Sequence, residues 1–306
     1  MKILRNNPNR IIVMTGATSG FGNITVQHLA EVANARVIVG ARGENRTLPS
    51  GVEVIPVDLA SLTSVREFVN AVIKAIGTNK IDILILNAGL HGSPAEDKSE
   101  DGYGLTFAVN HLSHYLISRL LLPYMSDNSR MVITSSNMHN PPFKVLAPKR
   151  LELDEWSHPT AGGNGTGVRS YIASKLCNLM TALYLSRLKE VKEQNVHIIA
   201  FNPGLTGSVV GRDASKLQKA IVKIITGTIF PILSLFKPEF KKNKAEHSGK
   251  MLADVALGNI VPPAGKIYVS LVRGIPTYPD PSELASNIEL QGKLWEKSAE
   301  MVGLKR

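Results

Sequence analysis

A tyrosine and a lysine stand four residues apart in "VRSYIASKLCNLM", a segment whose residue spacing predicts a helix. Side chains at i and i+4 share one helix face, so Tyr171 and Lys175 would be neighbours. The pKa of a phenol is ordinarily about 10, and an ammonium beside it favours the phenolate and lowers that pKa. Such a pair can exchange a proton with a substrate oxygen. On its own, the pair also fits an aromatic side chain and a charge on the wall of a buried helix.

A second stretch suited to chemistry lies near the N-terminus, where "IIVMTGATSGFGNITVQHLA" predicts a strand, a glycine-rich turn and a helix. Gly16, Gly20 and Gly22 allow the backbone to approach a phosphate closely, and the helix start offers free N–H groups and a positive dipole end. The spacing T-G-x-x-x-G-x-G differs from the G-x-G-x-x-G of many dinucleotide sites, and no Gly-Lys-Ser/Thr follows as in a P-loop. The turn predicts a pyrophosphate site; glycines that only relieve strain are the alternative.

The end of the next predicted strand, "VIVGARG", indicates which dinucleotide would bind. In NAD enzymes an acidic residue near this strand end commonly holds the ribose 2′-hydroxyl. Here Ala41 stands near that place and Arg42 follows it. A guanidinium can pair bidentately with a 2′-phosphate, so Arg42 predicts NADP(H) in preference to NAD(H). A surface arginine with no ligand is the alternative.

A sheet is needed to position these residues, and apolar runs of strand length recur along the chain. Most are continuous rather than alternating, which is typical of strands buried on both faces of a parallel sheet. Segments of helical period separate them, which predicts a Rossmann-type, doubly wound α/β sheet of about seven strands with helices on both faces. The predicted strands are Ile11–Met14, Val37–Val39, Val52–Val57, Ile81–Leu86, Met131–Thr134, His197–Phe201 and Lys266–Val269, and the clearest helices are Thr25–Ala33, Leu62–Ile76, Gly104–Met125 and Tyr171–Glu193.

The connections between predicted strands carry further polar residues. Between Val39 and Val52, "GARGENRTLPSG" barely reaches the length of a parallel crossover, so its helix should be vestigial. Asp58 follows the third strand and Asn87-Ala88-Gly89 follows the fourth. Ligands of such sheets bind beyond the carboxyl ends of the strands. These residues would therefore face one site, where Asp58 could accept a hydrogen bond from an adenine amino group.

Composition narrows the classes of partner. The formal net charge is +10, but the densest basic run, "KPEFKKNK", lacks interleaved aromatics and no nucleic-acid reading element is recognisable. A single cysteine, Cys177, excludes an intramolecular disulfide and suits a reducing, cytoplasmic compartment. The first ten residues do not resemble a signal peptide. No apolar run is long enough for a membrane-spanning helix; the nearest, Ala220–Phe236, is interrupted by Lys223 and Pro231.

Seven motifs appear in register between Ile11 and Thr206: TGATSGFG, Asp58, NAG, Asn110, ITSS, YIASK, and NPG followed by Thr206. In this order they resemble the short-chain dehydrogenase/reductase family. "SEDGYGLTFAVNHLSHYLI" and "YPDPSELASNIELQGKLWEKSAEMVGL" further resemble its retinol dehydrogenase and protochlorophyllide reductase branch. The resemblance implies a cofactor site formed by Gly16, Thr18, Ser19, Gly20, Phe21, Gly22, Arg42, Asp58, Leu59, Asn87, Ala88, Gly89, Tyr171, Lys175, Pro203, Gly204 and Thr206.

The resemblance also implies catalytic roles. Tyr171 would be the general acid in reduction and the base in oxidation. Lys175 would lower the Tyr171 pKa and bind the nicotinamide ribose. Ser136, in preference to Ser135, would hydrogen-bond the substrate carbonyl, and Asn110 would hold a water in a proton relay with Lys175.

The histidines near these motifs have weaker claims to a role. His111 and His114 are three residues apart on a predicted helix, but no third ligand is in view, so packing or surface roles are favoured over a metal and we predict no metal site. His139 follows Ser136 closely, and it either lines the substrate mouth or has no part in the site.

Two segments depart from common members of the family. Thirty-five positions separate Ser136 from Tyr171, and the inserted segment, 138–169, must cover the active-site mouth or the helix that starts at Tyr171. Monomeric carbonyl reductases carry an insertion there, so we expect this one to block the usual four-helix subunit interface and the chain, 1–306, to be a monomeric single domain. The second segment, 205–250, predicts a helical, substrate-side lobe. Its apolar and basic part, 216–244, forms a wall of a lipophilic substrate cavity or makes a peripheral membrane contact.

The function predicted from these features is an NADP(H)-dependent oxidoreductase that interconverts a carbonyl and an alcohol on a lipophilic small molecule. Two alternatives stay open. One is reduction of a C=C bond, as in protochlorophyllide reduction, which also uses a tyrosine and a lysine. The other is a non-catalytic, cofactor-sensing protein on the same fold, although such relatives usually lose the tyrosine or the lysine, and both are present here.

Overall fold

An eight-stranded sheet forms the centre of the computed structural model, which describes residues 10–43, 47–140, 146–206 and 242–305. The strand order is β10-β9-β6-β5-β4-β1-β2-β3, and every pairing is parallel except that of β10 with β9. The predicted doubly wound sheet is confirmed, with one more strand than expected. The strands are β1 (Arg10–Thr15), β2 (Ala35–Ala41), β3 (Glu53–Pro56), β4 (Ile81–Leu86), β5 (Met125–Thr134), β6 (His197–Asn202), β9 (Tyr268–Val272) and β10 (Ile275–Thr277).

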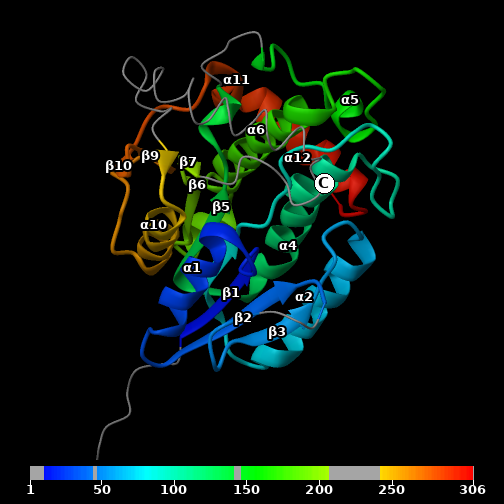
Figure 1. The fold of residues 1–306 in the computed structure, drawn as a ribbon. Helices are drawn as coiled ribbons and strands as arrows, with labels where there is room; N and C mark the ends of the chain where they lie inside the picture. Colours follow the sequence, from blue (N-terminus) through cyan, green and yellow to red (C-terminus); the bar gives the residue numbers. More distant parts are fainter. Residues whose placement is uncertain (1–9, 44–46, 141–145, 207–241, 306) are drawn as a thin grey trace, which may run out of the picture.

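The inner strands are continuous apolar runs because helices cover both of their faces. One face carries α1 (Gly20–Ala30) and α10 (Ala245–Leu257), which pack against each other. The other face carries α2 (Leu62–Ile76), α4 (Ser113–Leu121) and α6 (Gly167–Leu185). Figure 1 shows these two layers on either side of the sheet. The result is a three-layer arrangement whose strand ends are open for a ligand.

Helix α2 has the predicted bounds because both ends carry clear signals. The Ser61 hydroxyl accepts a hydrogen bond from the N–H of Ser64 at 3.3 Å, and Gly77 ends the helix at φ +62°, a conformation that glycine adopts readily. The predicted vestigial connection between β2 and β3 also holds, since the described part of 42–52 contains no helix.

Other predicted bounds were wrong. The predicted helix Gly104–Met125 divides into α3 (Leu105–Phe107), a π-helical turn η1 (Ala108–Leu112), α4 and the 3₁₀ turn η2 (Leu122–Tyr124). Helix α6 begins at Gly167 rather than Tyr171 and ends at Leu185, before a separate α7 (Lys189–Glu193). Strand β5 starts six residues before the predicted Met131, because its first half is polar and gives no apolar signal.

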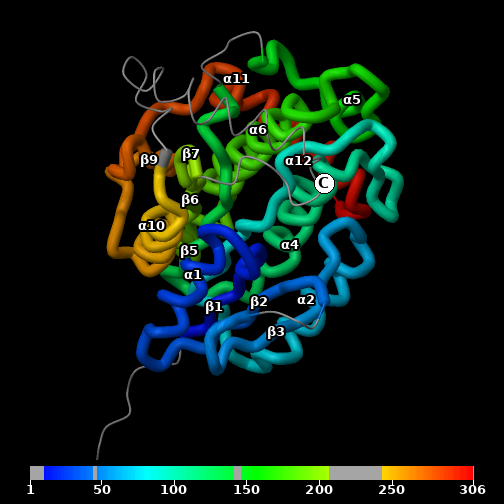
Figure 2. Tube along the Cα trace, in the orientation of Figure 1, coloured from blue at the N-terminus to red at the C-terminus, as the bar shows by residue number. Residues whose placement is uncertain are grey.

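The C-terminal segment returns to the α4 and α6 layer. After α11 (Glu283–Ser286), helix α12 (Ile288–Met301) packs along α6, and Figure 2 shows this last part of the chain beside α6 and α4. The Trp295 ring stacks on Tyr184 at 4.5 Å and meets Tyr115 edge-on at 4.9 Å. The Tyr115 hydroxyl donates to the Trp295 carbonyl at 2.9 Å. Helix α12 therefore covers the outer surface of α4 and α6.

In its described residues, 138–140 and 146–169, the inserted segment contains the end of η3 (Asn137–His139), α5 (Leu153–Ser157) and turns, and its last residues already belong to α6. It packs beside α3, where the Gly104 N–H donates to the Ser157 carbonyl at 2.7 Å. Of the predicted lobe, the structure describes β7 (Leu205–Thr206), β8 (Lys242–Asn243) and the start of α10; 207–241 lie outside the described residues. Among the helices that are described, none is long and apolar enough to cross a membrane.

Candidate active site

Four parallel strands end at one edge of the sheet, and the segments that follow carry most of the predicted site residues. β1 leads into Gly16–Gly22, β4 into Asn87–Gly89, β5 into Ser135 and Ser136, and β6 into Pro203 and Gly204. Helix α6 brings Tyr171 and Lys175 to the same edge, where Lys175 contacts Thr134 at the end of β5. The fold thus places residues from five segments together, although they are far apart in the sequence.

The glycine turn is shaped as a cradle. Gly16 has φ +73°, and a Cβ there would lie 2.5 Å from the Ala88 nitrogen. A Cβ on Gly22 would lie 2.0 Å from the Gly16 oxygen, whereas the space in front of Gly20 is open to 4 Å. The Ser19 side chain makes no capping hydrogen bond at the start of α1, so the first N–H groups of this helix are available to an anion. This arrangement fits the pyrophosphate of a dinucleotide, with Thr18, Ser19, Gly20 and Phe21 around it.

A set of buried hydrogen bonds ties this cradle to the neighbouring strand ends. The Asn87 amide donates to the Gly16 carbonyl at 3.0 Å and accepts from the Thr134 hydroxyl at 2.9 Å. The Thr15 hydroxyl accepts from the Asn87 N–H at 3.1 Å and lies 3.0 Å from Nε2 of His114. Thr15 and His114 were not predicted as site residues, because their contact spans 99 residues and no recognisable motif contains both.

The residues predicted to hold the adenosine half occupy the same edge. Arg42 comes directly after β2 and is exposed, while Leu59 is buried. The Asp58 carboxylate accepts from the Ala60 N–H at 3.0 Å through Oδ1. One of its oxygens is therefore used to shape the turn into α2. Whether the other accepts from an adenine stays a prediction.

Lys175 is buried beneath the loops, with its side chain 3% exposed. Its ammonium donates to the Thr134 carbonyl at 3.0 Å, and a Cβ on Gly89 would lie 3.5 Å from the Nζ atom. That distance is an ordinary van der Waals contact, whereas the Asn110 Oδ1 atom would lie closer, at 3.2 Å. Burial lowers the pKa of Lys175 to about 8, because the charged form loses its hydration.

Asn110 lies in the π-helical turn η1 and fixes the loop after β4. Its side chain accepts from the Leu90 N–H at 2.7 Å and donates to the Leu90 carbonyl at 2.9 Å. The same amide donates to the Ser174 hydroxyl at 2.9 Å. Both amide hydrogens are thus engaged. The predicted water relay to Lys175 stays a prediction, and it would have to use an oxygen of Asn110.

Tyr171 and Ser136 lie together in front of Lys175. Burial raises the pKa of the Tyr171 phenol, and the neighbouring Ser136 hydroxyl acts in the opposite direction. The Lys175 Nζ atom lies 5.8 Å from the centroid of the Tyr171 ring, and its ammonium is directed at Thr134. The net direction of the Tyr171 pKa is upward, opposite to the expected one, and the expected contribution of Lys175 stays a prediction. Tyr171 is a protonated phenol at neutral pH.

The two serines after β5 have different surroundings. Ser135 is buried, and its hydroxyl donates to the Lys175 carbonyl at 2.9 Å. Ser136 accepts from the Met138 N–H at 3.2 Å and is the serine that influences Tyr171. This geometry favours Ser136 as the hydroxyl that meets a substrate. His139 is buried, with Nδ1 2.7 Å from the Ser136 carbonyl, so it supports this turn rather than lining a mouth.

The segment after β6 is also held in place. Gly204 has φ +70°, and a Cβ there would lie 2.4 Å from Nδ2 of Asn243. The Pro203 carbonyl accepts from the Ser248 hydroxyl at 2.8 Å, which anchors it to α10. Thr206 lies on β7, which pairs with β8.

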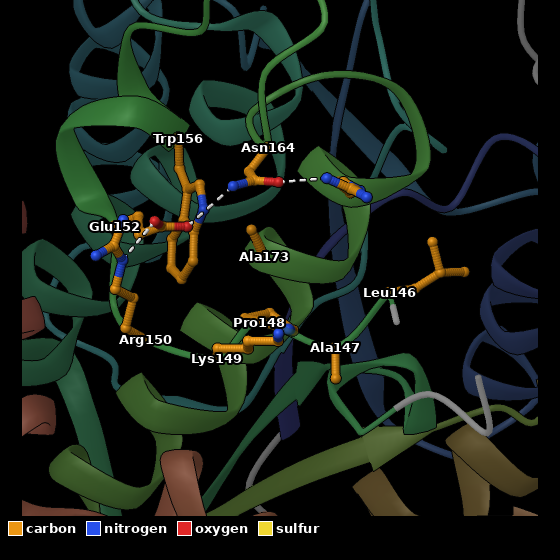
Figure 3. A pocket seen from close by; sticks show the side chains of 10 residues that line it. Leu146, Ala147, Pro148, Lys149, Arg150, Glu152, Trp156, Asn164 and Ala173 are labelled. Carbon is orange, nitrogen blue, oxygen red and sulfur yellow. Dashed lines mark hydrogen bonds and ion pairs between the residues drawn. The ribbon is translucent and has the colours of Figure 1, made fainter. Parts of the chain in front are cut away.

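The inserted segment forms a separate hollow against α6, with a volume of about 490 Å³. Figure 3 shows Trp156, Glu152 and Asn164 on one side of it and Ala173 of α6 close by. The Glu152 carboxylate accepts from Arg150 at 2.7 Å and from the Asn164 amide at 3.3 Å. The lining residues that the structure describes include none of the four predicted catalytic residues.

Comparisons with known proteins show which proteins this chain is similar to. The family model for short chain dehydrogenases matches residues 10–148. The chain is 30% identical to protochlorophyllide reductase B of Hordeum vulgare, over 95% of this chain and 78% of that protein. It is 29% identical to retinol dehydrogenase 13 of Homo sapiens, over 97% of this chain and 86% of that protein. A solved structure of a blue fluorescent protein from a metagenomic library, in complex with NADPH, shares the fold with a TM-score of 0.59 and 18% identity, over 88% of this chain and 99% of that one.

Proposed function

We propose that this chain, which belongs to the short-chain dehydrogenase/reductase family, is an NADP(H)-dependent oxidoreductase that interconverts a carbonyl and an alcohol on a lipophilic small molecule. One observation carries this assignment: Tyr171, Ser136 and Lys175 converge at the strand edge that also holds the glycine cradle. A proton donor and a dinucleotide site at one edge are the two requirements of carbonyl reduction. A cofactor-sensing protein would have no need of the first.

The residues act on the carbonyl oxygen. In reduction, the hydroxyls of Ser136 and Tyr171 donate hydrogen bonds to it, and Tyr171 transfers its proton as negative charge develops there. The raised pKa of Tyr171 keeps the proton available at neutral pH. NADPH, when bound at this edge, supplies the hydride. In oxidation the same phenol, once deprotonated, accepts the alcohol proton.

Lys175 keeps the expected role at the cofactor ribose. Its ammonium is held at the Thr134 carbonyl, below Gly89 and beside the cradle, where it can bind ribose hydroxyls of the cofactor. Positive charge at this depth would also favour the phenolate that remains after proton transfer.

NADP(H) is favoured as the cofactor by two features. Ala41 stands near the place where an acidic residue would select NAD(H), and Arg42 follows it. The blue fluorescent protein that shares this fold was solved with NADPH. A lipophilic substrate is suggested by the relatives, since a retinol dehydrogenase and a protochlorophyllide reductase both act on largely apolar molecules. Similarity to protochlorophyllide reductase B supports one second candidate, reduction of a C=C bond.

A substrate panel tests the proposal and separates the candidates. NADPH oxidation would be followed by the loss of the absorbance of NADPH, in the dark, with apolar ketones, aldehydes and enones. We expect turnover of ketones or aldehydes, with NADH a poorer donor. Products of the enone reactions would be identified by mass spectrometry and NMR, and a saturated ketone would favour the second candidate. NADPH binding without turnover of any member would contradict the assignment as an enzyme.

A further inference from the structure

His91 lies beside Tyr171, on the loop that follows β4. It follows Leu90 directly, and its ring centroid lies 5.5 Å from that of Tyr171, with the two planes tilted by 38°. The side chain is exposed, and no group in the described ranges hydrogen-bonds its ring. An imidazole with open hydrogen-bonding atoms thus stands beside the proposed proton donor.

The backbone around His91 is fixed on both sides. Before it, Asn110 binds both the N–H and the carbonyl of Leu90. After it, the Ser93 carbonyl accepts from the Gly167 N–H at 2.9 Å, at the first turn of α6. The Ser93 hydroxyl lies 2.8 Å from that of Thr106 and is buried. The backbone that carries His91 is thus held in place, which lowers the entropic cost of recognising a ligand there.

The loop that carries His91 makes a close contact with the start of α6. Gly92 has φ +118°, and a Cβ there would lie 2.2 Å from the Gly167 carbonyl oxygen. A glycine is therefore required next to His91 if the loop is to touch the helix that carries Tyr171. The distance between His91 and Tyr171 is in this way fixed by backbone packing rather than by a contact between the two side chains alone.

The imidazole is neutral at physiological pH. Although His91 reaches solvent, the protein atoms packed around its ring partly desolvate it, and this desolvation and the nearby Lys175 ammonium both lower the pKa of His91. A neutral imidazole offers one N–H donor and one nitrogen acceptor, and it does not attract a carboxylate by charge. The group suited to it is an uncharged oxygen, either a hydroxyl or a carbonyl. The 5.5 Å between the ring centroids is short enough for one small molecule to reach both side chains with two oxygens on neighbouring carbons.

We propose that His91 is a substrate-binding residue that hydrogen-bonds a second oxygen, on the carbon adjacent to the reacting carbonyl, so that the site prefers α-diketones and α-hydroxyketones to simple ketones. This inference rests on the proposed function, because it names the substrate class of the same site. The competing explanation is that the ring only packs against Tyr171, in which case a phenyl ring would serve equally well.

The test compares two probes that differ by one oxygen, 1-phenyl-1,2-propanedione and propiophenone. kcat/KM would be measured for both with NADPH in the wild type, His91→Phe and His91→Gln. Loss of one neutral hydrogen bond predicts that His91→Phe lowers kcat/KM for the diketone by about tenfold, mainly through KM, and leaves that for propiophenone unchanged. His91→Gln, which keeps a donor and an acceptor, restores part of the loss. His197→Phe is the control, because His197 is exposed at the opposite end of the strands, where β6 begins.

The outcomes separate this inference from the proposed function. Equal kcat/KM ratios for the two probes in wild type and His91→Phe would overturn the role of His91 and leave the oxidoreductase intact. A wild type that reduces other carbonyls but neither probe would also overturn it. A parallel fall for both probes, with weaker NADP⁺ binding and a lower melting temperature, would make His91 a structural residue. A wild type that reduces no carbonyl at all would overturn the proposed function, and this inference with it.

Discussion

Burial of the Lys175 ammonium lowers the stability of the folded protein, although the residue belongs to the candidate active site. Its ammonium is buried with one carbonyl partner, Thr134, and its pKa falls from 10.5 to about 8. The unfolded chain keeps this proton up to about pH 10.5, whereas the folded protein loses it above about pH 8. The folded state thus binds fewer protons between these values, so stability rises with pH in that window, and the cost of burial is fully present below pH 8.

Lys175→Met should therefore stabilise the protein at pH 7, by up to about 3 kcal/mol. Methionine fills a similar space, and the Thr134 carbonyl still accepts from the Asn178 amide at 3.2 Å. Urea unfolding at pH 7 and at pH 10 measures the effect, and the advantage of the variant should shrink to about 1 kcal/mol or less at the higher pH. Lys293→Met, on the exposed face of α12, is the control and should change stability little. A Lys175→Met protein less stable than wild type at pH 7 would refute this account of the buried charge.

Arg42 provides the residue-scale prediction on the cofactor. Arg42→Ala should weaken NADPH binding by about ten- to a hundredfold, because a hydrogen bond to a charged group contributes roughly 1.5–3 kcal/mol, and should leave NADH binding almost unchanged. Fluorescence titration of both cofactors measures this. Arg36→Ala is the matched control, since Arg36 lies at the other end of β2 and pairs with Glu53 at 2.7 Å. Equal losses for NADPH and NADH would contradict recognition of a 2′-phosphate.

The residues of the site could be predicted from local motifs, but the direction of their pKa shifts could not. Tyr171 and Lys175 could be paired because their spacing is local. The direction of the Tyr171 pKa depends on burial by segments distant in the sequence, and on where the ammonium points, toward Thr134, 41 residues away. The two contacts of Asn110 with Leu90 likewise depend on a π-helical turn that no residue pattern announced.

At the scale of elements, Trp295 anchors α12 to the rest of the fold. It packs between Tyr184 and Tyr115, the Arg119 guanidinium lies 4.7 Å from its ring centroid, and it is 6% exposed. Trp295→Ala should lower the free energy of unfolding by about 3–5 kcal/mol, as for other buried tryptophans. Urea unfolding tests this against Ile288→Ala, a control on the same helix whose side chain is 68% exposed. A loss below about 1 kcal/mol would show that α12 is only loosely attached.

Elements were predictable where apolar period and end signals agreed. Helix α2 has both, with Ser61 and Gly77 at its ends. The start of α6 was missed because "GGNGTG" resembles a loop, although Gly167 is held there by Ser93. The role of α12 was missed for another reason. Its sequence was noted only as a family resemblance, and a helix with a polar outer face gives no sign of which surface its apolar residues cover.

At the scale of the whole molecule, the outer surface of α4 and α6, which α12 covers, bears on the oligomeric state. The sequence predicted that the inserted segment would block the usual four-helix subunit interface, which includes the helix that carries Tyr171. The structure places α12 over α4 and α6 instead, while the insert packs beside α3. We therefore keep the proposal of a monomer but give it a different physical reason. The suggested membrane contact through 216–244 falls mainly outside the described residues and stays a proposal.

Light scattering coupled to gel filtration tests the monomer directly. The account predicts a mass of 33.2 kDa, independent of protein concentration, because α12 already occupies the surface that a partner would need. A particle of about four times that mass would contradict it. Repeating the measurement on Trp295→Ala adds a test of the reason, since loosening α12 should expose apolar surface and promote self-association.

The central claim, that Tyr171 donates the proton in an NADPH-dependent carbonyl reduction, is tested most directly by one comparison. Turnover of the best carbonyl in the panel and NADPH affinity would be measured side by side in wild type and Tyr171→Phe. The account predicts that turnover falls by about 10²–10⁴-fold, while the dissociation constant for NADPH, measured by fluorescence, and the fold stay nearly unchanged. A Tyr171→Phe protein that binds NADPH normally and retains wild-type turnover would contradict the claim.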